Sequence, residues 1–171
     1  LTSGGKSIEL ITYLPTILLV DDTLSNLRLL EDIFENLYNL PTAHDGEEAL
    51  ALLTAYPQLC SAVLLDRMMP DIQGEEVLRR MQQHDFLKHI PVIFQTARGT
   101  EKDIHEGFAL GADYYVNKPY DEEQLLIIVK AAIQKYAKRN LMYEEIQKMK
   151  NSLAIFSLAA AGSLEFRFNT I

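Results

Sequence analysis

The chain has 171 residues, 48% of them apolar, and its 24 acidic and 16 basic side chains give a net charge of −8. This length suits one domain with some tail left over, and the apolar share is enough for a buried core. The acidic balance argues against direct nucleic-acid binding by this segment, because such binding depends largely on phosphate neutralisation by Lys and Arg.

Cysteine content and hydropathy indicate the cellular compartment of the chain. Cys60 is the single cysteine, so no intramolecular disulfide forms, and we expect a small buried side chain in a reducing compartment. The longest apolar stretch near either end, at 153–161, is well short of the roughly 20 residues that a spanning helix needs. The sequence therefore predicts a cytoplasmic location and no membrane insertion.

The two ends are expected to lie outside the folded domain. Residues 1–14 are predicted to be a linker, and the start at Leu1 rather than Met indicates a piece of a longer protein. Residues 159–171, which end in GSLEFRFNTI, are interpreted as a tail of vector-derived or severed sequence.

Five segments of the chain are predicted to be strands. Continuous apolar runs that end in polar residues, as at 16–20, 61–66 and 90–96, are typical of parallel strands buried on both faces. A weaker strand is predicted at 39–43, and another at 113–117.

Amphipathic helices are predicted between these strands. The apolar positions of the first helix recur in steps of three and four: Leu27, Leu30, Phe34 and Leu37. Those of the second helix do the same: Ala49, Leu50 and Leu53. Five alternations of strand and helix, with right-handed crossovers and both sheet faces covered, predict a doubly wound α/β domain with a parallel sheet.

Local signals mark where several helices begin and end. Asp45 precedes the second helix in a turn, Gly74 opens the third, and Gly111 ends the fourth. Asp121 with Gln124 resembles a capping box at the start of the fifth helix.

The fifth helix is predicted to continue past the domain, to about Phe156, because no Pro or Gly interrupts it. Its extension at 139–158 has apolar residues in steps of four and three, a heptad seam: Met142, Ile146, Met149, Leu153 and Phe156. We expect a coiled-coil connector that forms a homodimer. A helix packed back on its own domain, or covered by a missing neighbour, remains an alternative, because Lys135 and Arg139 interrupt the seam upstream.

Polar residues at the carboxyl ends of the predicted strands indicate the chemistry. Asp21, Asp22, Asp66, Thr96 and Lys118 should converge at one edge of a parallel sheet, where ligands bind in such folds. Asp21, Asp22 and Asp66 would form a three-carboxylate site suited to Mg²⁺. Asp66 would be the nucleophile toward a phosphoryl group, with Lys118 and the Thr96 hydroxyl each binding a phosphoryl oxygen. Capping of the first helix by the acidic pair is the structural alternative.

The motifs LLVDDT, LLDRMMPDIQG, FQTAR and DYYVNKP carry a family resemblance. Residues 16–138 resemble the receiver domain of two-component response regulators, and we predict the domain at 15–138. The resemblance implies a flavodoxin-like fold with strand order 2-1-3-4-5 and phosphorylation of Asp66 by a sensor histidine kinase or a phosphotransfer protein. It also implies Mg²⁺ bound in part by the backbone carbonyl of Met68.

The resemblance further implies a switch in which Thr96 moves toward the phosphoryl group and Tyr115 turns inward. The adjacent Tyr114 leaves the choice of tyrosine open, and a cis peptide is expected before Pro119. Such a receiver is a signalling domain, and any enzyme activity would belong to a missing output domain.

Two other functions fit the sequence less well. A degenerate receiver that serves only as a dimerisation module is disfavoured, because all five site positions are intact. An Mg²⁺-dependent aspartyl phosphatase of the haloacid-dehalogenase type needs two aspartates separated by one residue, whereas Asp21 and Asp22 are adjacent.

Overall fold

The computed structural model describes residues 14–97 and 100–168, without the side chains of residues 101–103 and 159–168. The predicted linker at 1–14 therefore lies outside the described residues except for its last residue, as does the end of the predicted tail. The chain divides into two compact units, Leu1–Ile133 and Gln134–Ile171, and each is described by itself.

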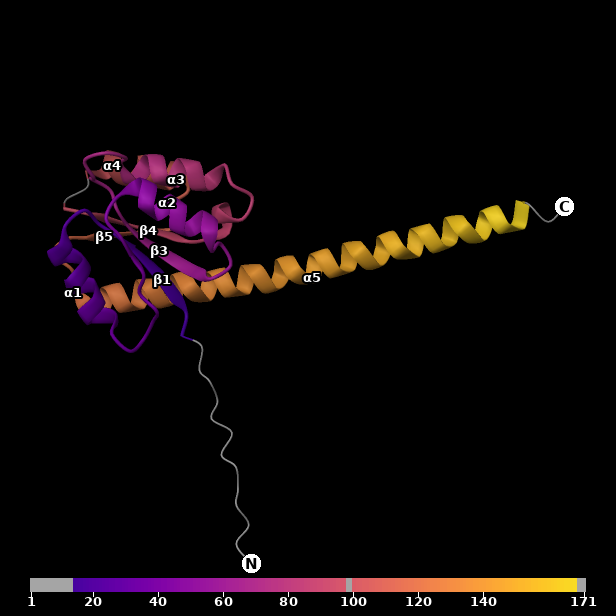
Figure 1. Ribbon diagram of the computed structural model, residues 1–171, viewed down its shortest axis with the longest axis horizontal. Helices are drawn as coiled ribbons and strands as arrows, with labels where there is room; N and C mark the ends of the chain where they lie inside the picture. Colours follow the sequence, from indigo (N-terminus) through magenta and orange to yellow (C-terminus); the bar gives the residue numbers. More distant parts are fainter. Residues whose placement is uncertain (1–13, 98–99, 169–171) are drawn as a thin grey trace, which may run out of the picture. The chain divides into compact units, whose positions relative to one another are not determined.

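The first unit contains a five-stranded sheet in the order β2-β1-β3-β4-β5 (Figure 1). All strand pairs are parallel. The strands are β1 Thr16–Val20, β2 Thr42–Ala43, β3 Cys60–Asp66, β4 Val92–Thr96 and β5 Tyr114–Asn117. The predicted doubly wound fold and strand order are confirmed.

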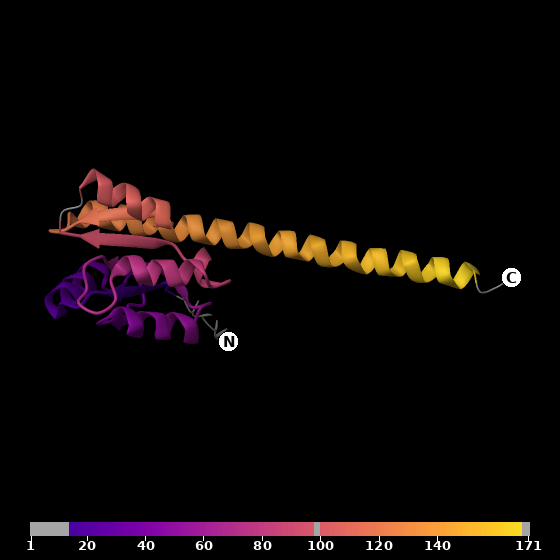
Figure 2. The ribbon, with the colours of Figure 1, turned by 90° about the horizontal axis from the view of Figure 1, so that it is seen from above.

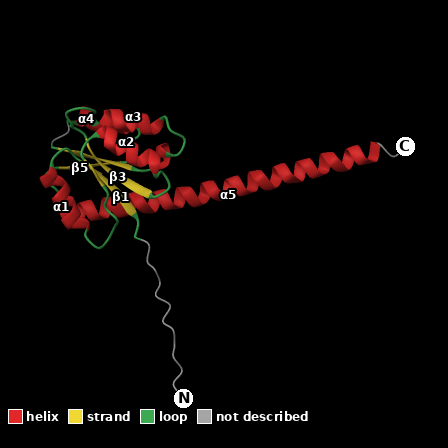
Figure 3. Cartoon of the chain, viewed as in Figure 1, coloured by secondary structure: helices red, strands yellow, loops and turns green. Residues whose placement is uncertain are grey.

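Helices cover both faces of this sheet, as Figures 2 and 3 also show. The helices are α1 Leu24–Phe34, α2 Gly46–Ala55, α3 Gly74–Gln82, the 3₁₀ turn η1 Leu87–His89, α4 Glu101–Leu110 and α5 Glu122–Phe168. Helix α1 and the first turns of α5 lie on one face, and α2, α3 and α4 lie on the other (Figure 1).

The core on the α1 and α5 side is built from alternate strand residues. Ile17 and Leu19 of β1 pack there with Phe34 of α1 and Val129 of α5, all fully buried. Leu18 and Val20 face the opposite layer and are also buried. Burial on both faces explains why the strands are continuous apolar runs.

Prolines shorten two of the predicted strands. Ile17 N donates to Asn39 O (2.9 Å) and Leu19 N donates to Pro41 O (3.0 Å), so segment 39–41 pairs with β1 before β2 begins. Pro41 has no N–H to complete a regular ladder. Similarly, Val63 N donates to Pro91 O (3.0 Å), and β4 begins only at Val92.

The first helix ends earlier than its apolar pattern predicts. Leu27, Leu30 and Phe34 are buried as expected, but α1 ends at Phe34, and Leu37 is 48% exposed. The helix stops because Glu35 leaves the helical conformation with a ψ of 136°, and Asn36 follows with a left-handed φ of 63°, which an asparagine adopts at low cost. In α2, Ala49 and Leu53 are buried, whereas Leu50 is half-buried.

Most predicted helix signals are confirmed. The Asp45 side chain caps α2 by accepting from Glu48 N (2.7 Å), and Asp121 accepts from Gln124 N (2.8 Å). Gly111 ends α4 with a φ of 102°, which a residue without Cβ adopts readily.

Helix α5 runs to Phe168, beyond the predicted limit near Phe156. In the second unit, the seam residues Met142, Met149 and Leu153 are 53%, 59% and 69% exposed. Within residues 14–97 and 100–168, no helix has both the length and the apolar content needed to cross a membrane.

Candidate functional site

The carboxyl ends of four strands bring the predicted site residues together. Asp21 follows β1, Asp66 ends β3, Thr96 ends β4, and Lys118 comes directly after β5. Because the strands are parallel, these residues share one edge of the sheet, where β1 and β3 are neighbours although their helices lie on opposite faces. This is the switch point at which ligands bind in doubly wound sheets.

Three carboxylates form a cluster at this edge. Asp21, Asp22 and Asp66 each place one oxygen within 4.8 Å of the others. Asp21 is fully buried and Asp66 is 6% exposed, whereas Asp22 is exposed to solvent. Mg²⁺ takes oxygen ligands at about 2.1 Å and keeps several waters, so two buried carboxylates beside an exposed one fit this ion.

Lys118 joins the cluster from the β5 side. Its Nζ lies 2.6 Å from Asp21 Oδ2 and 3.1 Å from Asp66 Oδ1. The side chain is 18% exposed, so both ion pairs are largely shielded from water. The backbone N of Lys118 donates to Thr96 O (2.8 Å), and the Lys118–Pro119 peptide is cis, as predicted.

The first turn of α1 holds Asp21 in place. Thr23 N donates to Asp21 Oδ1 (2.9 Å), and Asn26 Nδ2 donates to both carboxylate oxygens (3.1 and 3.0 Å). The N-cap residue of α1 is Thr23, so the two aspartates precede the cap position. With Lys118 as a further donor, Asp21 is fixed from three directions, and capping alone does not describe its role.

Burial raises the pKa of the Asp66 carboxyl, and the negative charge of Asp21 raises it further. Lys118 and a hydrogen bond from the backbone of Met68 oppose these effects without cancelling them. Lys118 therefore compensates only part of the cost of ionising Asp66. An added cation at the cluster would favour the charged, nucleophilic form of this carboxylate.

A glycine allows α3 to approach the acceptor strand closely. A Cβ on Gly74 would lie 2.5 Å from the backbone oxygen of Asp66 and 2.9 Å from the Phe94 ring. Gly74 N donates to Arg67 O (3.0 Å), and the Arg67 guanidinium pairs with Glu75. These contacts fix the backbone that follows Asp66, including Met68.

The two candidate switch tyrosines lie in different environments. Tyr115 pairs in register with Phe94 of β4, and its ring lies 5.4 Å from Phe94 and 5.1 Å from Phe108 of α4. Tyr114 packs against the core on the α1 and α5 side. Thr96 is two residues after Phe94 and so shares a face with Tyr115, which favours Tyr115 as its partner.

Sequence reasoning missed a polar pair beneath the carboxylates. Gln95 is fully buried in β4, and its Oε1 accepts a hydrogen bond from the Tyr120 hydroxyl. Burial, together with the charges of Asp21 and Asp66, raises the pKa of Tyr120. Gln95, a polar residue within the buried strand β4, was the available signal in the sequence. The sequence alone does not predict that Tyr120 is its hydrogen-bond partner.

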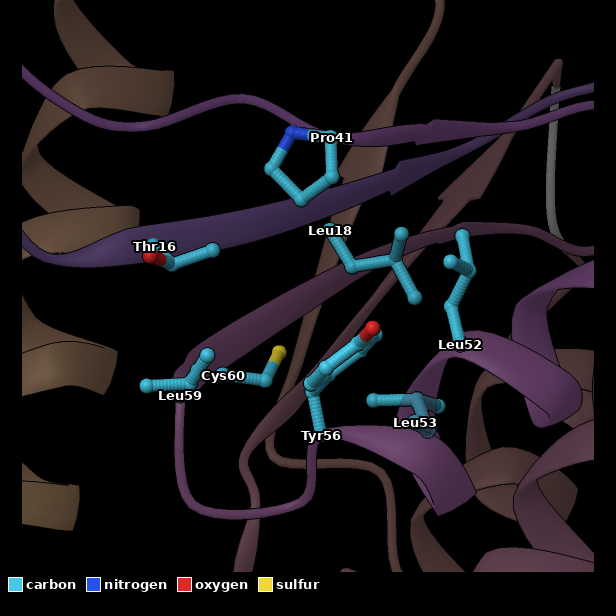
Figure 4. Close-up of a pocket in the computed structure, with 8 residues that line it drawn as sticks. All are labelled: Thr16, Leu18, Pro41, Leu52, Leu53, Tyr56, Leu59 and Cys60. Atoms are coloured by element: carbon cyan, nitrogen blue, oxygen red, sulfur yellow. The ribbon is translucent and has the colours of Figure 1, made fainter.

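An apolar cavity of about 300 Å³ lies at the opposite ends of β1 and β3. Figure 4 shows Leu18, Leu52 and Tyr56 directed into it, with the Cys60 thiol at its wall. Burial raises the pKa of Cys60 to about 11, so this thiol is an inert apolar group at neutral pH, as predicted. The cavity contains none of the site residues.

Comparisons with known proteins define the class. Residues 17–130 match the family described as response regulator receiver domain. The chain therefore belongs to the response-regulator receiver family, in which a phosphoacceptor role is typical, and it is a signalling module.

Three curated relatives show the extent of the match. The transcriptional regulatory protein CpxR of Klebsiella pneumoniae is 40% identical over 70% of this chain and 49% of its own length. The response regulator PleD of Caulobacter vibrioides is 34% identical over 80% of this chain and 29% of its own. A Vibrio cholerae protein named "Probable cyclic di-GMP phosphodiesterase" is 39% identical over 61% of this chain and 23% of its own. The chain thus spans half or less of these relatives.

Solved receiver structures agree with the fold. The Vibrio cholerae chemotaxis protein CheY4 superposes with a TM-score of 0.65 at 27% identity, covering 70% of this chain and 98% of that one. The signal receiver domain of an HD domain-containing protein from Pseudomonas fluorescens gives 0.67 at 27% identity, covering 73% and 98%.

Proposed function

We propose that this receiver accepts a phosphoryl group on Asp66, with Asp21 and Asp22 as metal ligands and Lys118 as the cation that binds the incoming phosphoryl oxygen. The observation that carries the proposal is the position of Lys118 Nζ, within 3.1 Å of Asp66 and 2.6 Å of Asp21. An ammonium beside the acceptor carboxylate reduces the charge repulsion that opposes attack on an anionic phosphoryl group.

The transfer is a substitution at phosphorus. An Asp66 oxygen forms the new P–O bond while the P–N bond to the donor histidine breaks, and that electron pair returns to the imidazole. Lys118 then pairs with a phosphoryl oxygen, and the Thr96 hydroxyl binds another. The three aspartates and the Met68 carbonyl would hold Mg²⁺, which would supply further positive charge to the phosphoryl group.

The partners follow from this chemistry. The donor would be a sensor histidine kinase or a histidine phosphotransfer protein, in the cytoplasm. The exposed seam of α5, centred on Met149 and Leu153, supports a homodimer in which two helices bury these side chains. An output domain beyond the receiver would then be controlled through this connector, and the partial coverage of longer relatives supports such an arrangement.

Phosphoryl uptake from acetyl phosphate tests the assignment. With Mg²⁺ present, the wild type should gain one phosphoryl group by intact-mass spectrometry, and Asp66→Asn should gain none. Asp71→Asn, at an exposed aspartate outside the cluster, is the matched control and should behave as wild type. Uptake that persists in Asp66→Asn would overturn the assignment of the acceptor.

A further inference from the structure

The hydrogen-bonded pair of Gln95 and Tyr120 lies directly beside the residues of the candidate site. Gln95 is one residue before Thr96 and is the register partner of Asp66 in the neighbouring strand. Its side chain is fully buried, and its Nε2 has no hydrogen-bond partner among the described residues. A buried amide is costly unless it is hydrogen-bonded, so the bond from Tyr120 is what this amide depends on.

The same bond ties down the turn that carries Lys118. Tyr120 is two residues past Lys118, and its hydroxyl reaches back to Gln95 on β4. The Lys118 backbone N reaches the next residue of β4, Thr96 (2.8 Å). The turn is therefore joined to β4 at Lys118, through the backbone N of the same residue that carries the ammonium group, and again at Tyr120, two residues later.

The direction of the hydrogen bond is fixed. The Tyr120 hydroxyl donates to the Gln95 carbonyl oxygen. Burial, and then the charges of Asp21 and Asp66, raise the pKa of this hydroxyl, which therefore keeps its proton. The Tyr120 ring meanwhile packs against the core on the α1 and α5 side, so both ends of the side chain are held.

We infer that Gln95 and Tyr120 are positioning residues that hold Lys118 in place for the phosphoryl group. This inference rests on the proposed function of the site. Neither residue touches the reacting atoms. The pair acts by restricting the turn, so its loss should weaken what Lys118 binds and leave what the aspartates bind.

The test compares two probes, Mg²⁺ alone and beryllofluoride with Mg²⁺, on Tyr120→Phe, Gln95→Met and the double variant. Each single variant should weaken beryllofluoride binding about tenfold, the usual cost of removing a supporting hydrogen bond behind a ligand. Mg²⁺ affinity should change less than about twofold, since Asp21 keeps its bonds from Thr23 and Asn26. In a Lys118→Ala background, Tyr120→Phe should have no further effect on beryllofluoride binding.

The double variant separates positioning from packing. Removing both polar groups leaves no buried amide unpaired, so its melting temperature should recover toward that of wild type. Its beryllofluoride affinity should stay low. Recovery of both quantities would mean that the pair only satisfies a buried amide, and the inference would be wrong. Wild-type protein that binds beryllofluoride no better than Asp66→Asn would instead refute the proposed function itself.

Discussion

The Tyr115 hydroxyl occupies the space in which a side chain on Gly107 would begin. An ideal Cβ at Gly107 would lie 1.3 Å from Tyr115 Oη and 2.5 Å from its Cζ, so the inward position of this tyrosine requires glycine at that place in α4. The ring is held between Phe94 and Phe108. The geometry thus links a candidate switch residue on β5 to one backbone position on the neighbouring helix.

Gly107→Ala should therefore displace Tyr115. We expect destabilisation by about 2 kcal/mol, typical of overpacking in a buried site, measured by urea unfolding. In a Tyr115→Ala background the same change should stabilise the protein by up to about 1 kcal/mol, because alanine is the better helix former. An equal loss in both backgrounds would show that the tyrosine is not the cause.

Loss of the lysine should leave a buried carboxylate without its cation. Asp21 is fully buried and depends on Lys118 for its ion pair, so Lys118→Ala should cost about 3 kcal/mol of unfolding free energy without metal. Added Mg²⁺ should still bind. Near-UV circular dichroism should no longer report a change around Tyr115 on adding beryllofluoride, and a normal response would contradict the proposed role.

The raised pKa of Asp66 predicts how stability depends on pH. Folding raises the pKa of this carboxyl, so its ionisation lowers the free energy of unfolding at a pH above the folded pKa. This cost vanishes when the pH is below the unfolded pKa of about 3.9. Asp66→Asn should then melt at a higher temperature than wild type at pH 7 with a chelator present. The difference should shrink as the pH falls through the folded pKa toward pH 4, and Asp71→Asn should show no such trend. A less stable Asp66→Asn protein at pH 7 would contradict this.

The seam of α5 predicts an assembly state. Leu153→Glu, at a residue 69% exposed in the second unit, should abolish a homodimer by placing charge in the coiled-coil interface. Asn151→Glu, off the seam, is the control and should leave the dimer intact. Light scattering with Mg²⁺, with and without beryllofluoride, measures both; a wild-type monomer under both conditions would refute the dimer.

Much of this molecule could be predicted because strand ends and apolar periodicity are local signals. Asp66 directly follows an apolar run, and Lys118 follows another after a single asparagine, so a parallel sheet must bring them together. The length of β2 and the end of α1 were not predictable from periodicity, because Pro41 and the turn at Glu35 and Asn36 set them through backbone geometry. The hydrogen bond between Gln95 and Tyr120 was not predictable either. Apolar periodicity predicts which face of the sheet a residue occupies, but not which side-chain atoms form a hydrogen bond.

The most direct test of the central claim is to locate the phosphoryl group chemically. An acyl phosphate is reduced by borohydride to an alcohol, which converts a phosphorylated aspartate to homoserine. After treatment with acetyl phosphate and Mg²⁺, peptide mass spectrometry should find this conversion at Asp66 and at no other aspartate. Conversion at Asp21, Asp22 or a surface aspartate, or none in protein that retains its fold, would contradict the account.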